Sequence, residues 1–433
     1  MSCFVGKLVA MIAVSPKPVK KVSVLLIVSL LTAVCLFQNS IALAAKTLGQ
    51  EQQNSPREQF AIDLEQKVFG PLINTTPGAA LVVVVDGRVL LQKTWGVQKA
   101  GDVEPVTEKT LFRLASISKT FASAAAAILV KEGAVQWQSP IKDSLAELNF
   151  KRPDYGNEIS LKHLMSQSSG LMPHAYTNLV EDNMSYDRIV KRLNRVDFIC
   201  APGECYGYQN VVFSLVGDVV AANTGVDYEG FVTRKIFEPL NMARASFGRE
   251  AFLDDPNHAK PHIWTGSRWR ETRTTDHYYR IPPAAGVNAS IEDMTQWLLA
   301  QLGHEPVVLS SDMLSEMHSP VIRTTLRQAH YKRRRGLGNT AYGLGWRLFD
   351  YGEDAGFVHH GGYVKGMRSE MMFNPRLQTG MVFLTNSEPS QMNNLVFDFL
   401  DLYREFRQSS EPAIVLMNRY QKPASQQVTP VGR

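Results

Sequence analysis

The chain is poor in cysteine, with four among its 433 residues. Cys3 and Cys35 lie in an N-terminal segment that we expect to be removed, so the remainder keeps Cys200 and Cys205. No cluster of histidine and cysteine with metal-ligand spacing occurs in the sequence, which therefore predicts no metal site. In an oxidising compartment, two cysteines separated by four residues predict a disulfide that closes a tight turn. So small a loop stabilises little by chain entropy, and its expected effect is to fix the geometry of the residues that follow.

The chain also lacks a strong excess of charge. Its formal net charge of +5 falls to about +1 without the first 44 residues, which contain four lysines and no acidic residue. Because nucleic-acid-binding proteins concentrate basic charge, the sequence predicts no nucleic-acid partner. The basic run Lys332-Arg333-Arg334-Arg335 is interpreted as a solvated loop.

An apolar run long enough to cross a membrane is absent as well. Residues 22–37 form an apolar run of about sixteen residues, whereas a spanning helix needs roughly twenty. This run follows a lysine-containing segment and precedes the small-x-small site Ala42-Leu43-Ala44, which is the pattern of a secretory signal. We therefore expect residues 1–44 to be a signal peptide that directs export, most simply to a bacterial periplasm. The alternative is an uncleaved segment that anchors the protein in the membrane.

The remaining chain is long enough for one large core or two closely packed domains. Its patterns predict strands at 78–85, 89–95, 356–359, 367–373 and 379–385. They predict helices at 57–69, 120–130, 159–165, 211–223, 228–236, 291–302 and 391–406. The predicted fold is α/β (α+β), an antiparallel sheet built from N- and C-terminal strands, flanked by helices, with a mostly helical inserted domain. The expected boundaries are 45–125 and 341–420 for the sheet domain, 126–340 for the insert and 421–433 for a disordered tail.

The motif Ser116-Ile117-Ser118-Lys119 stands at the start of a predicted apolar helix. A serine hydroxyl becomes a strong nucleophile only when a base removes its proton, and a desolvated lysine can be that base. Residues i and i+3 share a helix face, so Ser116 Oγ and Lys119 Nζ can converge. This pattern predicts a serine hydrolase. A second Ser-x-x-Lys, Ser139-Pro140-Ile141-Lys142, carries proline in a turn-like stretch and is interpreted as a loop.

Tyr-x-Asn occurs three times, and the copy Tyr208-Gln209-Asn210 has the context of a site. The copies at Tyr155 and Tyr176 lie in polar segments that we expect to be loops. The third follows the cysteine pair and directly precedes an apolar helix. A phenol beside a lysine ammonium loses its proton more easily, so Tyr208 is a candidate base or acid. The Asn210 carboxamide can both donate to and accept from a substrate amide.

The segment Val358-His359-His360-Gly361-Gly362-Tyr363 places two histidines and two glycines at the end of a predicted strand. Paired glycines let a backbone approach a ligand closely. An exposed strand-edge N–H in this segment, together with the Ser116 N–H at its helix N-terminus, could form an oxyanion hole. We expect the site to lie in the cleft between the sheet and the helical insert.

In this order, the three motifs resemble those of the serine β-lactamase and penicillin-binding protein-like family. The pattern is most similar to the group of class C β-lactamases, D-alanyl-D-alanine carboxypeptidases and esterases, and it covers residues 59–406. Further matching segments are Thr76-Pro77-Gly78, Leu161-Lys162-His163-Leu164-Met165-Ser166-Gln167-Ser168-Ser169-Gly170-Leu171, Tyr342-Gly343-Leu344-Gly345-Trp346 and Thr385-Asn386-Ser387.

The resemblance implies a β-lactamase/transpeptidase-like fold and a set of roles. Ser116 would be the acylated nucleophile, with Lys119 and Tyr208 as the proton-transfer network. Asn210 would bind the substrate amide, and the backbone N–H groups of Ser116 and Tyr363 would bind the oxyanion. The triplet His360-Gly361-Gly362 would take the place of the Lys-Thr-Gly or His-Thr-Gly triplet in the family. No cofactor is implied.

The triplet departs from the class C pattern in two ways. Histidine stands where those β-lactamases have lysine, and Gly361 replaces a Ser/Thr whose hydroxyl would help to hold a substrate carboxylate. We therefore expect acylation without efficient β-lactam hydrolysis, and neither Lys365 nor Arg368 can be assigned the missing contact. The predicted function is a seryl acyl-enzyme hydrolase for D-amino-acid peptides, β-lactams or carboxylic esters, with a peptidoglycan stem peptide as one candidate substrate. The alternatives are a carboxylesterase without peptidase or β-lactamase activity and a penicillin- or peptidoglycan-binding protein without turnover.

Overall fold

The computed structural model describes residues 54–325, 331 and 334–410. The predicted signal peptide at 1–44, the tail at 421–433 and the basic residues Lys332 and Arg333 lie outside the described residues. The chain divides into two compact units, Met1–Glu58 and Gln59–Arg433, and the second holds every element that positions the site. None of the helices within the described ranges is long and apolar enough to cross a membrane.

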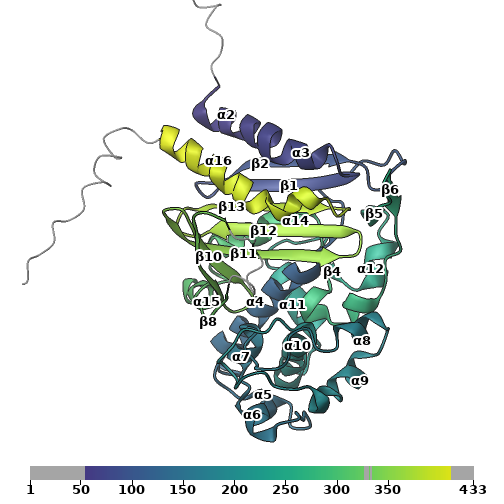
Figure 1. Ribbon diagram of the computed structural model, residues 1–433, viewed down its shortest axis with the longest axis vertical. Helices are drawn as coiled ribbons and strands as arrows, with labels where there is room; N and C mark the ends of the chain where they lie inside the picture. The colour runs from purple at the N-terminus through teal and green to yellow at the C-terminus, as the bar shows by residue number, and fades with distance from the viewer. Residues whose placement is uncertain (1–53, 326–330, 332–333, 411–433) are drawn as a thin grey trace, which may run out of the picture. The chain divides into compact units, whose positions relative to one another are not determined.

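An antiparallel sheet of eight strands forms the centre of the second unit (Figure 1). Its strand order is β2-β1-β13-β12-β11-β10-β9-β8, so the N-terminal hairpin pairs with the last strand of the chain. The strands are β1 (Gly78–Val85), β2 (Arg88–Gly96), β8 (Ile322–Arg323), β9 (Leu337–Tyr342), β10 (Arg347–Tyr351), β11 (Asp354–Val364), β12 (Met367–Asn374) and β13 (Thr379–Thr385). The chain thus has the predicted mixed α/β fold with an antiparallel sheet made from both ends of the sequence.

Two small sheets accompany the central one, and helices connect the strands. The small sheets contain β3 (Phe112–Arg113), β7 (Val287–Ala289) and β4 (Ser246–Phe247), and β5 (His262–Trp264) with β6 (Trp269–Glu271). The α-helices are α2 (Pro56–Asp63), α3 (Gly70–Ile73), α4 (Ser118–Lys131), α5 (Ile141–Ser144), α6 (Pro153–Glu158), α7 (Leu161–Met165), α8 (Thr177–Glu181), α9 (Tyr186–Val190), α10 (Asn210–Thr224), α11 (Tyr228–Val232), α12 (Arg249–Asp254), α13 (Pro282–Ala285), α14 (Ile291–Gln301), α15 (Ser311–Met317) and α16 (Leu395–Ser410). Two π-helical segments, η1 (Leu64–Phe69) and η4 (Thr233–Phe237), and four 3₁₀ turns, η2 (Ala115–Ile117), η3 (Leu193–Arg195), η5 (His277–Arg280) and η6 (Ser390–Asn393), complete the described elements.

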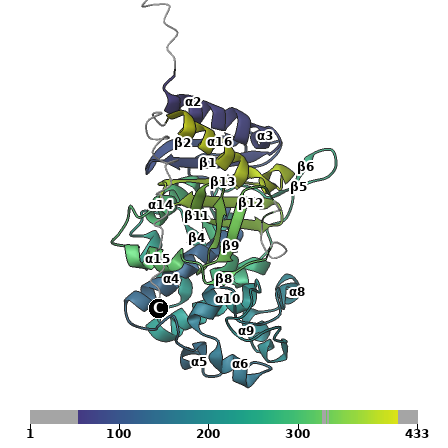
Figure 2. The ribbon, with the colours of Figure 1, turned by 60° about the vertical axis from the view of Figure 1, so that its left-hand side comes forward.

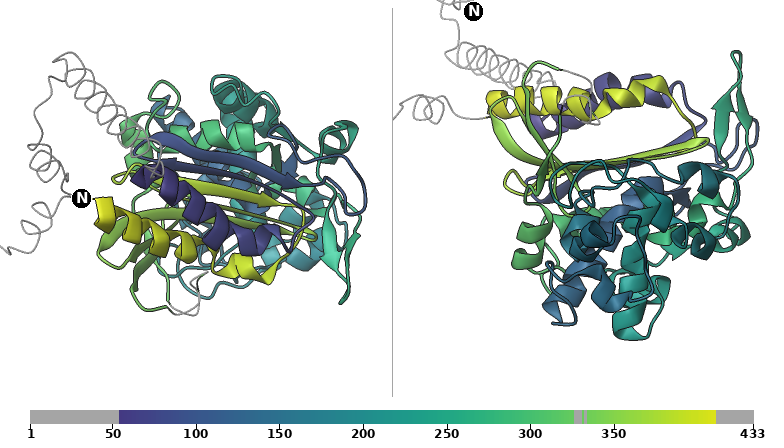
Figure 3. Two further views of the ribbon diagram at one scale, coloured as in Figure 1. Left: turned by 90° about the horizontal axis from the view of Figure 1, so that it is seen from above. Right: turned by 60° about the horizontal axis from the view of Figure 1, so that its bottom comes forward.

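Helices cover both faces of the sheet, and the β1 sequence Gly-Ala-Ala-Leu-Val-Val-Val-Val reflects this. All eight residues of β1 are buried. Ala80, Val82 and Val84 join the core that contains α4, while the alternate residues join a second core with η1 and α16. Figure 3 shows α16 lying across the strands on one side, with the larger group of helices on the other. A strand covered on both faces needs apolar residues at every position, which explains the continuous apolar run.

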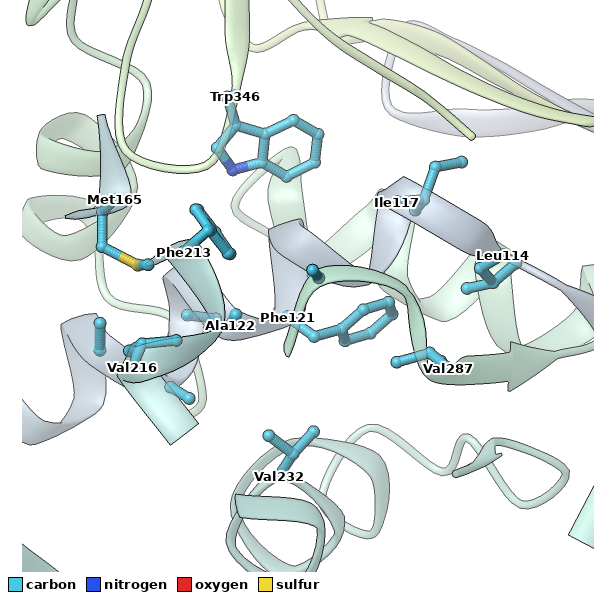
Figure 4. Packing of buried hydrophobic residues seen from close by; sticks show 14 of the residues in the cluster. Leu114, Ile117, Phe121, Ala122, Met165, Phe213, Val216, Val232, Val287 and Trp346 are labelled. Atoms are coloured by element: carbon cyan, nitrogen blue, oxygen red, sulfur yellow. The ribbon is translucent and has the colours of Figure 1, made fainter. Parts of the chain in front are cut away.

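Helix α4 runs through the middle of the larger core, as its apolar sequence predicts. Twelve of its residues, from Ser118 to Leu129, are buried. Phe121 stacks on Trp297 with ring centroids 4.1 Å apart. Figure 4 shows Phe121 and Ala122 surrounded by side chains from other elements, among them Phe213 of α10 and Val232 of α11. This packing fixes the N-terminal end of α4, and therefore Ser116, against the sheet.

The structure differs from the predicted elements in several places, and the short strands β3 to β8 were not predicted. Strand β11 extends to Val364, so the His-His-Gly-Gly segment lies inside a strand rather than at its end. Strands β9 and β10 were not predicted, because Gly343-Leu344-Gly345 interrupts their alternation after a few residues each. Both Tyr-x-Asn copies that were expected in loops are partly helical, because Tyr155 lies in α6 and Thr177 and Asn178 begin α8.

Candidate active site

Ser116 occupies the 3₁₀ turn η2 that leads directly into α4. The residue before it, Ala115, has a φ of 49°, a left-handed conformation that is unusual for a residue other than glycine. Strained backbone of this kind tends to occur at functional sites. Strand β11 packs so closely on this turn that a Cβ atom at Gly362 would collide with the carbonyl oxygen of Leu114. Gly362 therefore allows β11 to approach Ser116.

Lys119 is fully buried one helical turn after Ser116, as the i, i+3 spacing predicts. Its Nζ atom lies 3.3 Å from Ser116 Oγ, 2.7 Å from Asn210 Oδ1 and 3.0 Å from the carbonyl oxygen of Ala284. Burial holds the pKa of Lys119 well below its usual value, and the positive charge of Arg347 lowers it further. A lysine in this environment can be an uncharged amine near neutral pH.

Tyr208 also contacts Ser116, and its ring centre lies 4.8 Å from Lys119 Nζ. Its hydroxyl donates a hydrogen bond to Ser116 Oγ over 3.0 Å. Burial raises the pKa of the Tyr208 phenol, and this effect outweighs the lowering effects of Arg347 and of the hydrogen bond to Ser116. The expected lowering of this pKa by a lysine ammonium is therefore not found, because burial of the phenol is the largest effect and raises the pKa.

The segment before Tyr208 is fixed by the cysteine pair and by a second loop. The Sγ atoms of Cys200 and Cys205 lie 1.97 Å apart, within bonding distance. Gly203 N donates to the carbonyl oxygen of Ser168, and Gly207 N donates to that of Gln167. The Gln167 side chain also accepts a hydrogen bond from the Gln209 N–H over 2.7 Å. The segment quoted at 161–171 thus holds the loop that presents Tyr208 and Asn210.

Asn210 is the first residue of α10 and lines the cavity beside Ser116. Its carboxamide oxygen accepts the hydrogen bond from Lys119, so a contact with substrate would come from the NH₂ group. The structure therefore brings Ser116, Lys119, Tyr208 and Asn210 together.

His360 is placed differently from the expectation for a substrate-binding residue. The side chain is 1% exposed and does not line the cavity, although Gly361, Gly362 and Tyr363 do. Its Nδ1 donates to the carbonyl oxygen of Gly361 over 2.9 Å, and its Nε2 accepts from Tyr342 over 3.2 Å. Burial, with smaller contributions from Arg347 and Lys119, lowers the pKa of His360 well below its usual value. A neutral imidazole behind the cavity wall cannot serve as the anion contact.

Tyr363 lies where β11 runs past the end of its neighbour. The ladder between β10 and β11 begins at the pair Arg347 and His359, so the following residues of β11 extend beyond β10 toward Ser116. The Tyr363 side chain is 59% exposed, and its hydroxyl donates to Glu388 over 3.2 Å. This large side chain therefore lies exposed at the edge of the cavity, with its hydroxyl held by Glu388.

Charged residues that the sequence did not single out also line the cavity. Arg347 donates to the Tyr206 hydroxyl over 3.3 Å, and its guanidinium lies 5.4 Å from the centre of the Tyr208 ring. Glu370 accepts from Arg368 at 3.1 Å and lies 2.7 Å from His359 Nε2. Only a weak sequence signal was present, because Arg347 directly follows the Tyr342–Trp346 motif and Glu370 is an acid within the predicted strand at 367–373. Lys365, in contrast, is exposed in the turn after β11.

The cavity beside Ser116 has a volume of about 510 Å³. It lies between the sheet and the helical part of the chain and is lined by Ser116, Pro173, His174, Thr177, Tyr206, Gly207, Tyr208, Asn210, Tyr278, Ala285, Arg347, Gly361, Gly362, Tyr363, Arg368 and Glu370. Within the described residues, no group of three or more histidine, cysteine, aspartate or glutamate side chains could hold a metal ion.

The second Ser-x-x-Lys shows none of this arrangement. Ser139 lies in a bend, where its hydroxyl accepts a hydrogen bond from Gln136 N, and Lys142 belongs to the short helix α5. Tyr176, from another Tyr-x-Asn copy, donates to the carbonyl oxygen of Arg192. These residues provide natural controls for the ones at the site.

Known proteins resemble this chain over much of its length. A protein named Beta-lactamase from Escherichia coli (strain K12) is 25% identical over 362 residues, which cover 75% of this chain and 88% of the relative. Protein flp from Staphylococcus aureus (strain NCTC 8325 / PS 47) is 23% identical over 333 residues, which cover 74% of this chain but 61% of flp. The chain thus spans less than two thirds of the length of flp.

A solved structure shares the fold. The octameric penicillin-binding protein homologue from Pyrococcus abyssi superposes with a TM-score of 0.68 at 22% identity, over 83% of this chain and 80% of that one. The profile of the family described as Beta-lactamase matches residues 66–402, a range that includes each of the three motifs. Because this match spans most of the chain, the protein belongs to the beta-lactamase family.

Proposed function

We propose that this protein is a serine hydrolase that works through an acyl-enzyme on Ser116 and acts best on uncharged carboxylic esters and amides. The observation that carries the proposal is the position of Ser116 Oγ, 3.3 Å from the buried Lys119 Nζ and 3.0 Å from the Tyr208 hydroxyl. A nucleophile and a base within hydrogen-bond reach, beside a cavity, are the signature of nucleophilic catalysis.

Lys119 is the base in this proposal because of its hydrogen-bond partners. An uncharged amine has two hydrogens and one lone pair. The oxygens of Asn210 and Ala284 can only accept hydrogen bonds from it, so they take the two hydrogens. The lone pair is then left for Ser116, the third neighbour of Nζ. The Ser116 proton can pass to Lys119 as Oγ attacks the carbonyl carbon.

Tyr208 acts as the acid. Its pKa is raised while that of Lys119 is lowered, and two groups whose pKa values are pushed apart in this way divide acid and base roles. The N–H groups of Ser116 and Tyr363 would stabilise the negative oxygen of the tetrahedral intermediate. As the C–O or C–N bond breaks, Tyr208 gives its proton to the leaving group and regains one through Lys119. Water then releases the acyl group from Ser116.

The preference for uncharged substrates follows from Glu370. Its carboxylate lines the cavity and faces Gly361, where the family triplet has a hydroxyl for a substrate carboxylate. A substrate carboxylate at this position would meet a like charge, and the two cations of the cavity wall are already engaged, Arg368 with Glu370 and Arg347 with the Tyr206 hydroxyl. We therefore expect weak β-lactamase activity and better activity on neutral esters.

One pair of assays tests this function. Purified protein should hydrolyse 4-nitrophenyl butyrate with a higher kcat/KM than a chromogenic cephalosporin, and Ser116→Ala should lose both activities. Acylation without turnover of either compound would favour a penicillin- or peptidoglycan-binding protein. Efficient cephalosporin turnover would contradict the role given to Glu370.

We also propose export, on the pattern of residues 1–44 alone. Secretion fits the cysteine pair, since disulfides persist in oxidising compartments. Cell fractionation with N-terminal sequencing should find the protein in the periplasm with Ala45 as its first residue. A cytoplasmic protein that keeps its N-terminus would contradict this proposal.

A further inference from the structure

Two aromatic side chains on the described part of the chain are more than half exposed, one beside a groove and the other beside the catalytic cavity. Trp264 is 55% exposed and Tyr363 is 59% exposed. Every other Phe, Tyr and Trp in the described ranges is buried or partly buried. Indole and phenol rings carry large apolar faces, so exposed examples that lie near one another often mark a binding surface.

Trp264 stands on the hairpin β5–β6, which projects from the body of the molecule (Figure 2). The facing residue Trp269 packs against it, with ring centroids 5.3 Å apart and planes at 67°. The position of the Trp269 ring is fixed by a hydrogen bond, because its Nε1 donates to the carbonyl oxygen of Thr75 over 2.8 Å. The exposed face of Trp264 is thus supported from behind by a second ring.

The base of this hairpin is attached to the strands that form the catalytic cavity. His262 N donates to the carbonyl oxygens of Gly366 and Asn386, each over 3.0 Å. The His262 ring bridges the Asn386 carbonyl oxygen and the Ala100 N–H. Gly366 belongs to the turn after β11, three residues beyond Tyr363, so the hairpin and the predicted oxyanion hole share one rigid support.

A groove of about 640 Å³ runs beside the hairpin. Trp264 and Trp269 form one part of its wall, and Asn74, Thr75, Glu388 and Gln391 supply amide, hydroxyl and carboxylate groups. Glu388 also accepts the hydrogen bond from the Tyr363 hydroxyl, and Tyr363 lines the catalytic cavity. The groove therefore adjoins the cavity, with the Tyr363–Glu388 pair between them.

We propose that this groove binds an oligosaccharide of pyranose rings, with Trp264 as the stacking platform. A pyranose presents C–H groups on its face and hydroxyls around its rim, which matches an indole face beside polar side chains. A membrane surface would favour a convex apolar tip, whereas Trp264 here borders a recessed groove that contains the Glu388 carboxylate. A saccharide in this groove would lie next to the acyl bond cleaved at Ser116. Binding itself does not depend on the proposed hydrolase function.

Binding of defined saccharides tests the proposal. Chitotetraose and cellotetraose, which differ in acetamido groups, are titrated into the Ser116→Ala protein by calorimetry and tryptophan fluorescence. We expect saturable binding of at least one of them, with a fluorescence change. Trp264→Ala should weaken binding at least ten-fold, Trp264→Phe should retain much of it, and Val307→Ala, at a side chain that is 97% exposed, should change nothing. Thermal unfolding of each variant reports whether it folds.

Specific results would contradict saccharide binding in this groove. If neither saccharide binds, or if a folded Trp264→Ala protein binds with unchanged affinity, the proposal is overturned. Co-sedimentation with phosphatidylglycerol vesicles that Trp264→Ala abolishes, without saccharide binding, would make the hairpin a membrane contact instead. Turnover of 4-nitrophenyl butyrate by wild-type protein is measured separately, so a failure of the saccharide proposal and a failure of the hydrolase proposal give different results.

Discussion

A Cβ atom placed on Gly361 would lie 2.6 Å from Oε2 of Glu370. The two residues face each other across β11 and β12, and the missing side chain of one makes room for the carboxylate of the other. The absence of a side chain at position 361 and the carboxylate at position 370 are therefore structurally coupled. A serine or threonine at position 361 requires Glu370 to move.

Glu370→Gln should improve activity on carboxylate-bearing substrates relative to neutral ones. The variant keeps the shape of the side chain and removes the like charge, an effect that we place at about 1.4 kcal/mol, or ten-fold in kcat/KM. The measurement compares a 4-nitrophenyl hemisuccinate with 4-nitrophenyl butyrate on both proteins. An unchanged ratio of the two kcat/KM values would show that Glu370 does not set this preference.

Tyr208→Phe should slow substrates according to their leaving groups. If the phenol protonates the leaving group, 4-nitrophenyl esters should lose little rate, while alkyl esters and amides should lose about 10²–10⁴-fold. Lys119→Met should slow both classes, because the base acts on Ser116 in each. Tyr176→Phe is the matched control, since that tyrosine contacts a backbone carbonyl away from the site. An equal loss by Tyr208→Phe on both ester classes would remove the acid role.

The pH dependence of kcat/KM should follow Lys119. Its folded-state pKa is well below the usual value, so the amine is a competent base above that depressed pKa, and activity falls as pH decreases through it. Activity should therefore be high at neutral pH, far below the pKa of an exposed lysine. Pre-steady-state acylation of wild-type protein between pH 4 and 10 gives this profile, and a rate that rises only above pH 9 would contradict a neutral Lys119.

The free energy of unfolding should also reveal that the buried Lys119 amine is uncharged. The unfolded chain binds a proton at Lys119 up to about pH 10.4 while the folded protein does not, so folding stability gains from this residue as pH rises toward that value. Lys119→Met lacks this contribution. The difference in unfolding free energy, wild type minus variant, should increase between pH 7 and 10, and a constant difference would indicate a charged lysine in the folded state.

The Cys200–Cys205 bond should matter more for activity than for global stability. Closing so short a loop contributes about 2 kcal/mol, and backbone hydrogen bonds to Gln167 and Ser168 also hold the loop. Replacing both cysteines with serine should lower kcat with a small change in Tm, because the loop presents Tyr208. Two reactive thiols in oxidised protein under non-reducing conditions would reject the bond.

The sequence predicted the layout of the fold because its main signals are local. The Asp86-Gly87 turn has φ values of 52° and 70°, as a tight hairpin turn requires, and it lies where the Asp-Gly pair predicted it. The apolar run of α4 predicted a buried helix for the same reason. The hairpin β5–β6 and strands β9 and β10 are short and carry mixed residues, so their pairing depends on distant partners that local patterns do not reveal.

The residues of the site also fall into two groups, those that local sequence patterns predict and those that they do not. The i, i+3 spacing of Ser116 and Lys119 is a helical property and could be predicted, as could the loop that delivers Tyr208 and Asn210. The side of the strand on which His360 lies could not, because the predicted strand ended at 359 and the structure continues it to Val364. Arg347 and Glu370 enter the site through cross-strand neighbours, which are a property of the assembled sheet.

Ser116 should become acylated with help from Lys119, and every other proposed step of hydrolysis depends on this one. Intact-protein mass spectrometry after incubation with a fluorophosphonate probe measures this directly, followed by peptide mapping of the adduct. We expect one adduct per chain on Ser116 in wild-type and Ser139→Ala protein, none in Ser116→Ala, and slow labelling in Lys119→Met. An adduct that persists in Ser116→Ala, or that maps to another serine, would contradict this expectation.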